Sequence, residues 1–481
     1  MRNLYHDQSF ADRILALTPD EAQMDLMLKN RFTVAKLGWQ PRWFNPDLEK
    51  WLHRIKLPAL VVWGDDDKIM PPANAALWRE RLPDARLVMV DDCGHLPHVE
   101  HAILIAKHVR EFVEGVVVEA AKHRSPWVVL PNRLYDPVKG AEEYERHIDA
   151  LVYAEQLGFD AIGVNEHHQT AYGLMPAPNL IASALIQRTK TIKIAILGRA
   201  LPLVSNPIYI AEEFAMLDVM SKGRIIAGFV RGIGSEYHSS GTNPYFSHER
   251  FHEAHDLIIR AWTDPGPFAF DGDHFSLRYV NLWPRPYQTP HPPVWIPSQG
   301  SSETIAWAAD PKRKYPFLVT FSSADLVARY HNTYRDKARQ YGYEVAPEQL
   351  GWACPIYVAE TEARARAEAG PAVETLFNDF LRQSFEMLMP PGYTSIGSMK
   401  NFINMRRGLL GGGRATAEGL IASGTALIGS PRTVLDGIER MRERTGFGIL
   451  VALLQFGILS DELTRRNMDL FAAEVMPCLR S

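Results

Sequence analysis

The chain has 481 residues, of which 46% are hydrophobic and 22% charged, with a formal net charge of -4. This is the composition of a globular protein long enough for more than one domain. Its Lys and Arg residues are spread along the sequence, which argues against a nucleic-acid or membrane partner. No apolar run is long enough to cross a bilayer and the N-terminus does not resemble a signal peptide, so we expect a cytoplasmic protein.

The cysteines Cys93, Cys354 and Cys478 are odd in number and far apart in the sequence. They therefore predict neither a disulfide framework nor a metal site.

The first 117 residues form one predicted segment, followed by a linker over residues 118–126. Two short runs rich in Val and Leu, at 57–64 and 85–92, are typical of parallel strands that are buried on both faces. Helical patterns lie between these runs, at 73–82, and after them, at 102–115. This segment is predicted to be a small α/β unit.

From residue 127 to residue 481, apolar runs alternate with amphipathic helices. Eight such units predict an α/β fold, a (β/α)8 TIM barrel with insertions at 233–292 and 381–423. In this architecture the chemistry lies at the carboxyl ends of the strands. The predicted strands lie at 127–132, 161–168, 192–201, 224–232, 293–300, 315–321, 351–360 and 448–457.

The second predicted strand of the barrel ends in Asn165, Glu166, His167 and His168. Adjacent side chains on a strand point to opposite faces, so the two histidines do not suit one metal ion. One imidazole would face the barrel mouth, where it can act as acid, base or hydrogen-bond partner. The alternative is a pair of structural histidines bound to neighbouring loops.

The next two predicted strand ends carry groups that suit an anion. Arg231 follows the fourth strand and can pair bidentately with a phosphate. Gly300, Ser301 and Ser302 follow the fifth strand and open a helix, where hydroxyl and N–H groups accept an anion. An ordinary helix cap is the alternative for the serines. Together, these two strand ends predict a phosphorylated cofactor.

Several motifs in order resemble the bacterial luciferase family of flavin-dependent monooxygenases. They are Glu-His-His at 166–168, Asn-Pro at 206–207, LDVMSKGR at 217–224, Arg-Gly at 231–232 and the approach to the fifth strand at 277–304. The resemblance covers residues 126–481. It implies reduced FMN supplied by a separate flavin reductase, and oxygenation of a small, largely apolar organic substrate by O2 through a C4a-peroxyflavin. It also implies a homo-dimer or a hetero-oligomer.

The resemblance assigns roles to individual positions. His167, with Glu166 beside it, corresponds to the active-site histidine, and Arg231, Gly300, Ser301 and Ser302 correspond to phosphate ligands. Gly198 and Arg199 fall where the family often has a cis non-prolyl peptide against the flavin ring. The segment 381–423, with Gly411–Gly413, Arg406, Arg407 and Arg414, corresponds to a mobile lid, although a solvated loop is the alternative.

The sequence also departs from the family. Val230 stands where light-emitting members have a cysteine, and His248 replaces a second phosphate-binding arginine, with Arg250 nearby as a substitute. Light emission and the details of phosphate binding therefore stay open. For the substrate pocket, Asn132, Tyr172, Tyr237 and Trp295 suggest apolar, aromatic walls.

The first segment resembles the last third of α/β-hydrolases, with Asp67 and His95 at the positions of the acid and the base. No G-x-S-x-G nucleophile elbow occurs in the chain, and Ser9 is the only serine before residue 125. An acid and a base without a nucleophile cannot carry out acyl transfer, so we expect a packing or docking segment. Two further alternatives for the whole chain are a deazaflavin-dependent hydride-transfer enzyme and a non-catalytic flavin-binding or assembly protein.

Overall fold

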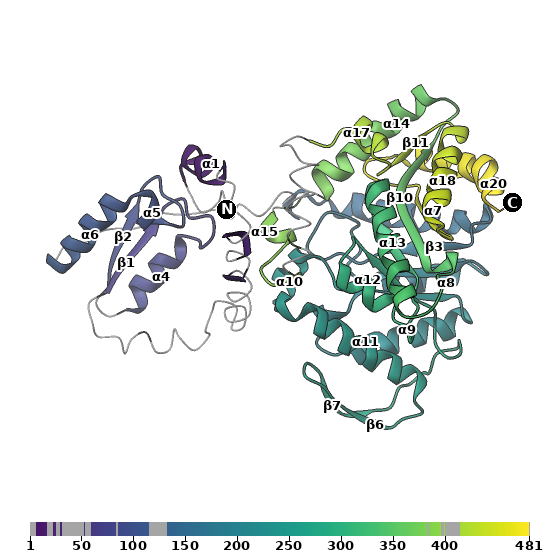
Figure 1. The fold of residues 1–481 in the computed structure, drawn as a ribbon, viewed down its shortest axis with the longest axis horizontal. Coiled ribbons are helices and arrows are strands. Elements are labelled where there is room, and N and C mark those ends of the chain that lie inside the picture. Colours follow the sequence, from purple (N-terminus) through teal and green to yellow (C-terminus); the bar gives the residue numbers. More distant parts are fainter. Residues whose placement is uncertain are drawn as a thin grey trace. The chain divides into compact units, whose positions relative to one another are not determined.

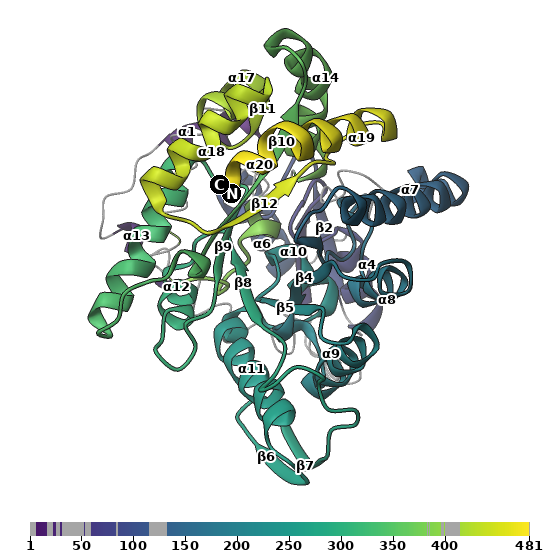
Figure 2. The same cartoon turned by 90° about the vertical axis from the view of Figure 1, so that its right-hand side faces the viewer.

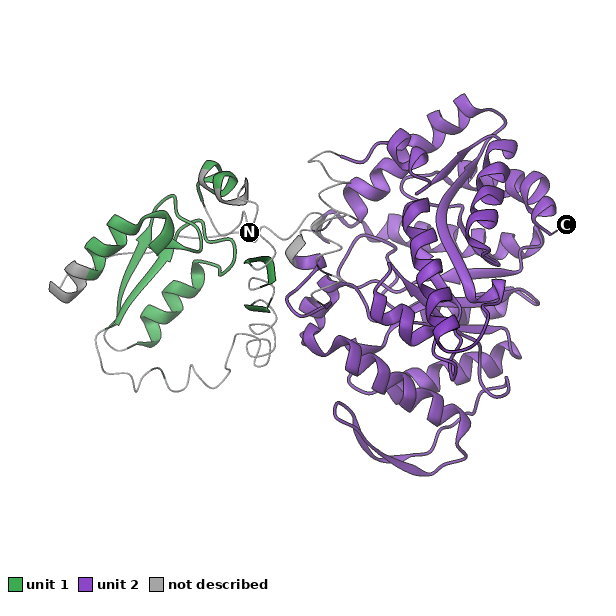
Figure 3. Cartoon of the chain, in the orientation of Figure 1, with its two compact units in different colours: residues 1–129 green, residues 130–481 purple. Residues whose placement is uncertain are grey.

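The computed structural model of the chain describes residues 6–16, 23–25, 29–30, 59–82, 85–114, 132–381, 385–395 and 414–480, and the single residues 52, 383 and 399. The chain separates into two compact units, residues 1–129 and 130–481 (Figure 3). The predicted linker at 118–126 and nearly all of the predicted strand at 127–132 lie outside the described residues.

The first unit contains both of its predicted strands. Strands β1 (Ala59–Gly64) and β2 (Ala85–Val90) pair in parallel along their whole length. Val88, Val90 and Cys93 form their buried cluster. The helices of this unit are α1 (Gln8–Ala16), α4 (Ala73–Arg81), α5 (Pro97–Glu100) and α6 (Ala102–Glu114).

The second unit is built on a curled parallel sheet with helices around its outer face (Figures 1 and 2). Six strands follow one another in space in the order β3, β4, β5, β8, β9 and β10. The α/β fold class is confirmed, and seven of the eight predicted strands lie in this sheet. The strands are β3 (Ala161–Val164), β4 (Lys193–Ala200), β5 (Ile225–Val230), β8 (Val294–Ser298), β9 (Phe317–Thr320), β10 (Leu350–Val358), β11 (Leu427–Gly429) and β12 (Ile449–Leu453).

The far edge of β10 is shared by two strands. Its residues 351–355 pair with β12, and its residues 356–358 pair with β11. The sequence did not predict β11, because a strand of three residues has no readable hydrophobic period.

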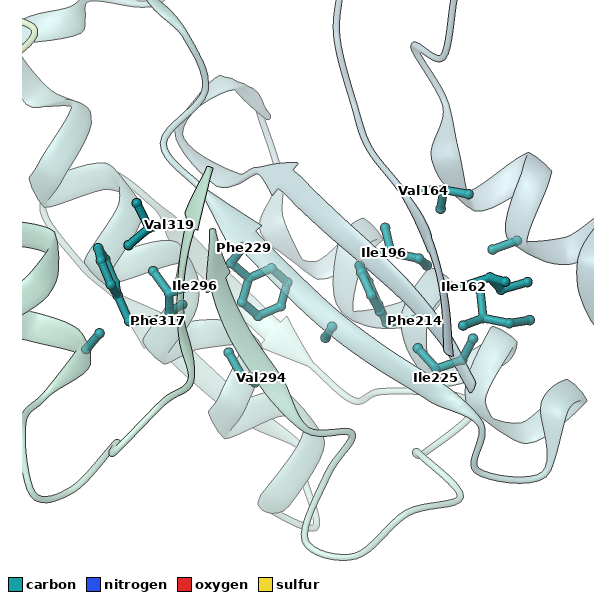
Figure 4. Close-up of a cluster of buried hydrophobic side chains, with 14 of the residues drawn as sticks. Ile162, Val164, Ile196, Phe214, Ile225, Phe229, Val294, Ile296, Phe317 and Val319 are labelled. Atoms are coloured by element: carbon teal, nitrogen blue, oxygen red, sulfur yellow. The ribbon is translucent and has the colours of Figure 1, made fainter. Parts of the chain in front are cut away.

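Apolar side chains from neighbouring strands and helices interlock beneath the sheet (Figure 4). Phe229 of β5 lies 5.7 Å from Phe214 and 6.1 Å from Trp262, measured between ring centroids. All three rings are buried. This packing fixes the strands, and so it also fixes the positions of the residues at their carboxyl ends.

Polar caps begin several of the helices that cover the sheet. Asp136, Asn206 and Ser430 each accept a backbone N–H at the first turn of the following helix. The helices of this layer are α7 (Pro137–Gln156), α8 (Pro178–Arg188), α9 (Pro207–Ser221), α11 (Ser247–Thr263), α12 (Ser302–Ala308), α13 (Ala324–Gln340), α14 (Glu362–Thr375), α17 (Ala417–Ala422), α18 (Pro431–Thr445), α19 (Asp461–Leu470) and α20 (Met476–Leu479).

Two charged side chains bind the backbone near the amino ends of β4 and β5. The guanidinium of Arg224 donates to the carbonyls of Ile186, Thr189 and Ile192 at 3.1–3.3 Å. The carboxylate of Glu155 accepts the N–H groups of residues 190–192 at 2.7–3.1 Å. The amino ends of these strands are therefore held by two side chains that do not line the cavity.

The insertion at 233–292 contains helix α10 (Gly234–Ser240), helix α11 and the hairpin of β6 (Phe268–Asp271) and β7 (Ser276–Val280). Glu253 holds the turn of this hairpin by accepting N–H groups from Asp273, His274 and Phe275. The described part of the 381–423 insertion includes α15 (Phe385–Leu388), which contacts α10. Arg406, Arg407 and Gly411–Gly413 lie outside the described residues.

Candidate active site

The carboxyl ends of β3, β4, β5 and β8 line one cavity, which continues down the inner face of the sheet. Glu166, His167, Gly198, Arg231, Gly300, Ser301 and Ser302 all contribute to its wall. The structure therefore brings together most of the residues that the sequence selects, although they span 136 positions in the chain.

His167 is held by a buried carboxylate. Its Nδ1 lies 3.2 Å from Oε1 of Glu236, a residue of α10 that is only 2% exposed. Both oxygens of Glu236 are acceptors, because Oε1 also takes the N–H of His168 and Oε2 takes that of Ile233 at 2.8 Å. Nδ1 of His167 is thus placed to donate, which leaves Nε2 for chemistry in the cavity.

Sequence reasoning missed Glu236, which lies 69 positions from His167 within an insertion. The only signal for it was an acid shortly after the Arg-Gly pair of the fourth strand. Nothing in a single sequence relates that acid to the histidine.

Glu166 and His168 belong to a second polar group, next to the first. Oε1 of Glu166 lies 3.0 Å from Nε2 of His168, and Oε2 lies 2.7 Å from Nη1 of Arg199. The hydrogen bond with Glu166 raises the pKa of His168. Of the two adjacent histidines, only His167 lines the cavity, but both lie beyond the end of β3 at Val164, so the alternation of a strand does not explain this difference.

The backbone at Gly198 is unusual, as expected, but it does not contain a cis peptide bond. The cis bonds among the described residues all precede proline, so the Gly198–Arg199 bond is trans and the expectation from the resemblance is wrong for this structure. Instead, Gly198 has a φ of +125° at a register shift between β4 and β5. The bulge gives the backbone its irregular course, and glycine accommodates it because this φ is strained for other residues.

Arg231 leaves β5 and lies among oxygen atoms. Its Nη1 donates to the carbonyl of Tyr393 at 2.8 Å and to the hydroxyl of Ser247 at 3.1 Å. The guanidinium also lies over the Tyr393 ring, 4.6 Å from the centroid. The 381–423 insertion therefore holds the arginine that was expected to bind phosphate.

Ser301 and Ser302 lie across the cavity wall at the start of α12. Both hydroxyls donate to the same carboxylate oxygen, Oε2 of Glu303, at 2.9 and 3.0 Å. Ser301 also caps the helix by accepting the N–H of Thr304 at 3.4 Å. Both interpretations of these serines, as a cap and as a set of donors, are compatible with this geometry.

Arg250 and His248 are placed differently from the other expected phosphate ligands. Arg250 does not line the cavity, and its guanidinium donates to the carbonyls of Pro202 and Val204 at 2.9 and 3.0 Å. His248 is buried, and its burial together with the charge of Arg231 lowers its pKa to about 3. Neither side chain is positioned to replace a second phosphate arginine.

Two of the four aromatic and polar residues expected in the substrate pocket face the cavity. Tyr172 and Trp295 line it, and the Tyr172 ring lies 4.9 Å from the imidazole of His167. Tyr237 is fully buried and Asn132 lies away from the cavity wall, so the expectation for these two is wrong.

The first unit contains an acid–base pair of its own. Nδ1 of His95 lies 2.8 Å from Oδ2 of Asp67, a buried carboxylate that also accepts the N–H groups of Ile69 and Met70. Cys93 is buried, and burial raises the pKa of its thiol to about 12, which removes thiolate character. Within the described residues of this unit, no serine accompanies the pair on a strand-to-helix turn.

In the described part of the chain, no helix is both long and apolar enough to cross a membrane. No three His, Cys, Asp or Glu side chains among those residues come together in a way that would hold a metal ion.

A curled parallel sheet that is covered by helices and has a cavity at the carboxyl ends of its strands defines a protein of the TIM-barrel class. Residues 126–448 match the family described as luciferase-like monooxygenase. The chain therefore belongs to the luciferase-like monooxygenase family and is a flavin-dependent oxidoreductase. Residues 22–102 match the alpha/beta hydrolase fold, which confirms the resemblance of the first segment.

Relatives with known names span several activities. The chain is 27% identical over 245 residues to the alkanal monooxygenase beta chain of Vibrio harveyi, covering 50% of this chain and 72% of the relative. The oxygenating constituent of 3,6-diketocamphane monooxygenase from Pseudomonas putida, solved with FMN, has a TM-score of 0.56 at 20% identity and covers 69% of this chain and 93% of its own. An F420-dependent secondary alcohol dehydrogenase has a TM-score of 0.54 at 17% identity, covering 70% and 96%.

Proposed function

We propose that this chain oxygenates a small, largely apolar organic molecule with O2, using reduced FMN delivered by a separate flavin reductase. The observation that carries the proposal is the meeting of three features on one cavity wall. These are the His167–Glu236 pair, the Arg231 guanidinium, and the hydroxyls of Ser301 and Ser302. Apolar and aromatic side chains complete the wall and favour an apolar substrate.

The donors of this wall fit the phosphate of FMN. Arg231 supplies a guanidinium, and Ser301 and Ser302 supply hydroxyls, which is the donor chemistry that binds phosphate. Gly198 has no side chain beside Val230, where a Cβ would come within 3.1 Å of a Val230 methyl group. We infer that the phosphate lies near Arg231 and the serines, with Gly198 beside the ring system.

When bound, reduced flavin supplies two electrons and the reaction with O2. The chain's own contribution is to hold the proton on Nδ1 of His167 through Glu236, so that Nε2 can accept or return a proton in the cavity. Tyr172 packs against the imidazole and keeps this side of the cavity apolar. Exclusion of water by such walls favours oxygen transfer over release of hydrogen peroxide.

A deazaflavin-dependent hydride transfer is the second candidate, since a solved F420-dependent dehydrogenase shares the fold. The two candidates are separated by titrating the protein with reduced FMN and with reduced deazaflavin under argon. Turnover is then measured with O2 and a panel of n-alkanals and cyclic ketones. Oxygenation only with reduced FMN supports the proposal. Reduction of an alkanal or ketone with reduced deazaflavin alone would replace it, and no turnover with either cofactor would favour a non-catalytic flavin-binding protein.

The first experiment on the site itself is Arg231→Ala. We expect FMN affinity to fall by roughly 10- to 100-fold, because a charge-assisted pair with the phosphate is lost. Riboflavin lacks the phosphate and its affinity should change little. The exposed Arg339 provides a matched control through Arg339→Ala. Equal weakening of FMN and riboflavin by Arg231→Ala would show that Arg231 does not contact the phosphate.

We also propose that the second unit associates with another copy or a related chain through α8 and α9. Leu180 of α8 is 73% exposed, and Tyr209, Met216 and Met220 of α9 are 61%, 51% and 39% exposed. The three α9 residues follow helical spacing and form one stripe. An exposed apolar stripe of this kind favours protein association.

A further inference from the structure

The donors expected to bind phosphate are already engaged by groups of the chain itself. The carboxylate of Glu303 accepts from Ser301 at 2.9 Å and from Ser302 at 3.0 Å. It also receives hydrogen bonds from the hydroxyl of Ser395 and from its own backbone N–H. Because α12 has only seven residues, these side-chain hydroxyls, rather than the helix as a whole, provide the anion-binding character.

The other half of the donor set is engaged from the same segment. Tyr393 accepts from Arg231 through its carbonyl, and Ser395, two residues later, binds Glu303. The short segment 393–395 therefore contacts both the guanidinium and the carboxylate. A phosphate that uses Arg231 and the serines has to take the place of Glu303 and of the Tyr393 carbonyl.

Glu303 is an anion at neutral pH. Burial alone would raise its pKa, but the hydrogen bonds from Ser395, its own N–H, Ser301 and Ser302 lower it to about 2. A carboxylate and a phosphate dianion cannot share the same hydroxyl hydrogens, and they repel each other at short distance. The carboxylate therefore acts against a phosphate at this position.

We propose that Glu303 determines the affinity of this chain for the phosphate of its cofactor, by occupying the hydroxyls of Ser301 and Ser302 until the phosphate displaces it. This inference rests on the proposed function. Its consequence is a lower affinity for FMN, while the rest of the flavin site is unchanged. Such weakening suits a cofactor that is taken up in its reduced form and released after every turnover.

The test compares wild type, Glu303→Gln and Glu303→Ala, with Glu348→Gln as a control of equal charge change at an exposed position. Dissociation constants are measured for FMN and riboflavin, and the melting temperature is measured with and without inorganic phosphate. We expect both Glu303 variants to bind FMN at least about tenfold more tightly than wild type, because the Ser301 and Ser302 hydroxyls no longer donate to a competing carboxylate. Riboflavin affinity and the control variant should not change.

Inorganic phosphate should raise the melting temperature of the Glu303 variants more than that of wild type. The Gln variant keeps the side-chain volume, so the test can still be read if the Ala variant does not fold. Weaker or unchanged FMN binding in both variants would overturn the inference and make Glu303 an ordinary helix cap. The proposed function would stand in that case, as long as the wild-type protein binds FMN. If neither wild type nor the variants bind FMN, both proposals fail.

Discussion

Replacing Glu236 by Gln should separate the positioning of His167 from the stability of the fold. Glu236 is 2% exposed and receives N–H groups from the His167 ring, from His168 and from Ile233. A glutamine of the same shape has one acceptor and one donor end. One of its ends must therefore face an N–H group with its own NH2 group.

The magnitude follows from the two orientations of the amide. If the amide oxygen stays with the histidines, the Ile233 N–H is left buried and unpaired, which costs about 1–3 kcal/mol. If the oxygen stays with Ile233, the NH2 group faces Nδ1 of His167 and imposes the opposite tautomer. The nitrogen in the cavity then carries a hydrogen, and proton transfer should slow by roughly 10²- to 10⁴-fold.

The chain provides a matched control in Glu253. This carboxylate also accepts three backbone N–H groups, from Asp273, His274 and Phe275, but it lies on α11 and does not line the cavity. We expect Glu253→Gln to lower the melting temperature by a similar amount without changing oxygenation. Melting curves and single-turnover yields of oxygenated product per reduced FMN, with the best probe substrate, give both quantities. Wild-type oxygenation by Glu236→Gln would refute the role of Glu236 in orienting His167.

Three further expectations concern other parts of the chain. His331 is buried, and burial lowers its pKa to about 4 from 6.5, so the unfolded chain binds a proton that the folded chain does not. The free energy of unfolding should therefore fall as the pH drops from 6.5 towards 4, by about 2 kcal/mol between pH 7 and pH 5. This fall should be smaller in His331→Gln. Chemical unfolding of both proteins at the two pH values measures it. Short activated esters should not be hydrolysed above background by wild type or by His95→Ala, and a wild-type rate that vanishes in the variant would contradict the view that the first unit is not a hydrolase. Met216→Glu should shift the mass measured by light scattering towards the monomer, and an unchanged mass would remove α9 from the interface.

Much of the barrel follows from the sequence because its strands are short, apolar and bounded by recognisable helix starts. The strand ends that carry His167, Arg231 and Ser301 were therefore identifiable one at a time. The partners Glu236 and Tyr393 were not, because they lie 69 and 162 positions from His167 and Arg231, and no local pattern relates residues so far apart. Arg250 shows the same limit, since its place beside His248 in the sequence suggested a phosphate ligand, whereas folding directs it to the Pro202 carbonyl.

The backbone at Gly198 shows a different limit. A glycine within a predicted strand indicates unusual dihedral angles, but the sequence alone does not distinguish a cis peptide from a bulge with positive φ. The sequence also gave no reason to expect β11, since its three residues gain their strand conformation only from pairing with β10.

The carbonyl and amide contacts of Arg224 and Glu155 have a consequence for how this fold can diversify. They lie at the amino ends of β4 and β5, whereas His167, Arg231 and Ser301 follow the carboxyl ends of their strands, so a change in a loop that carries those site residues leaves these contacts in place. The substrate specificity can then change through substitutions in a few loops. The same contacts make residues 186–192 and Arg224 a poor place for engineering, and they suggest that libraries for new substrates should keep these residues fixed and vary the loops after β3, β5 and β8.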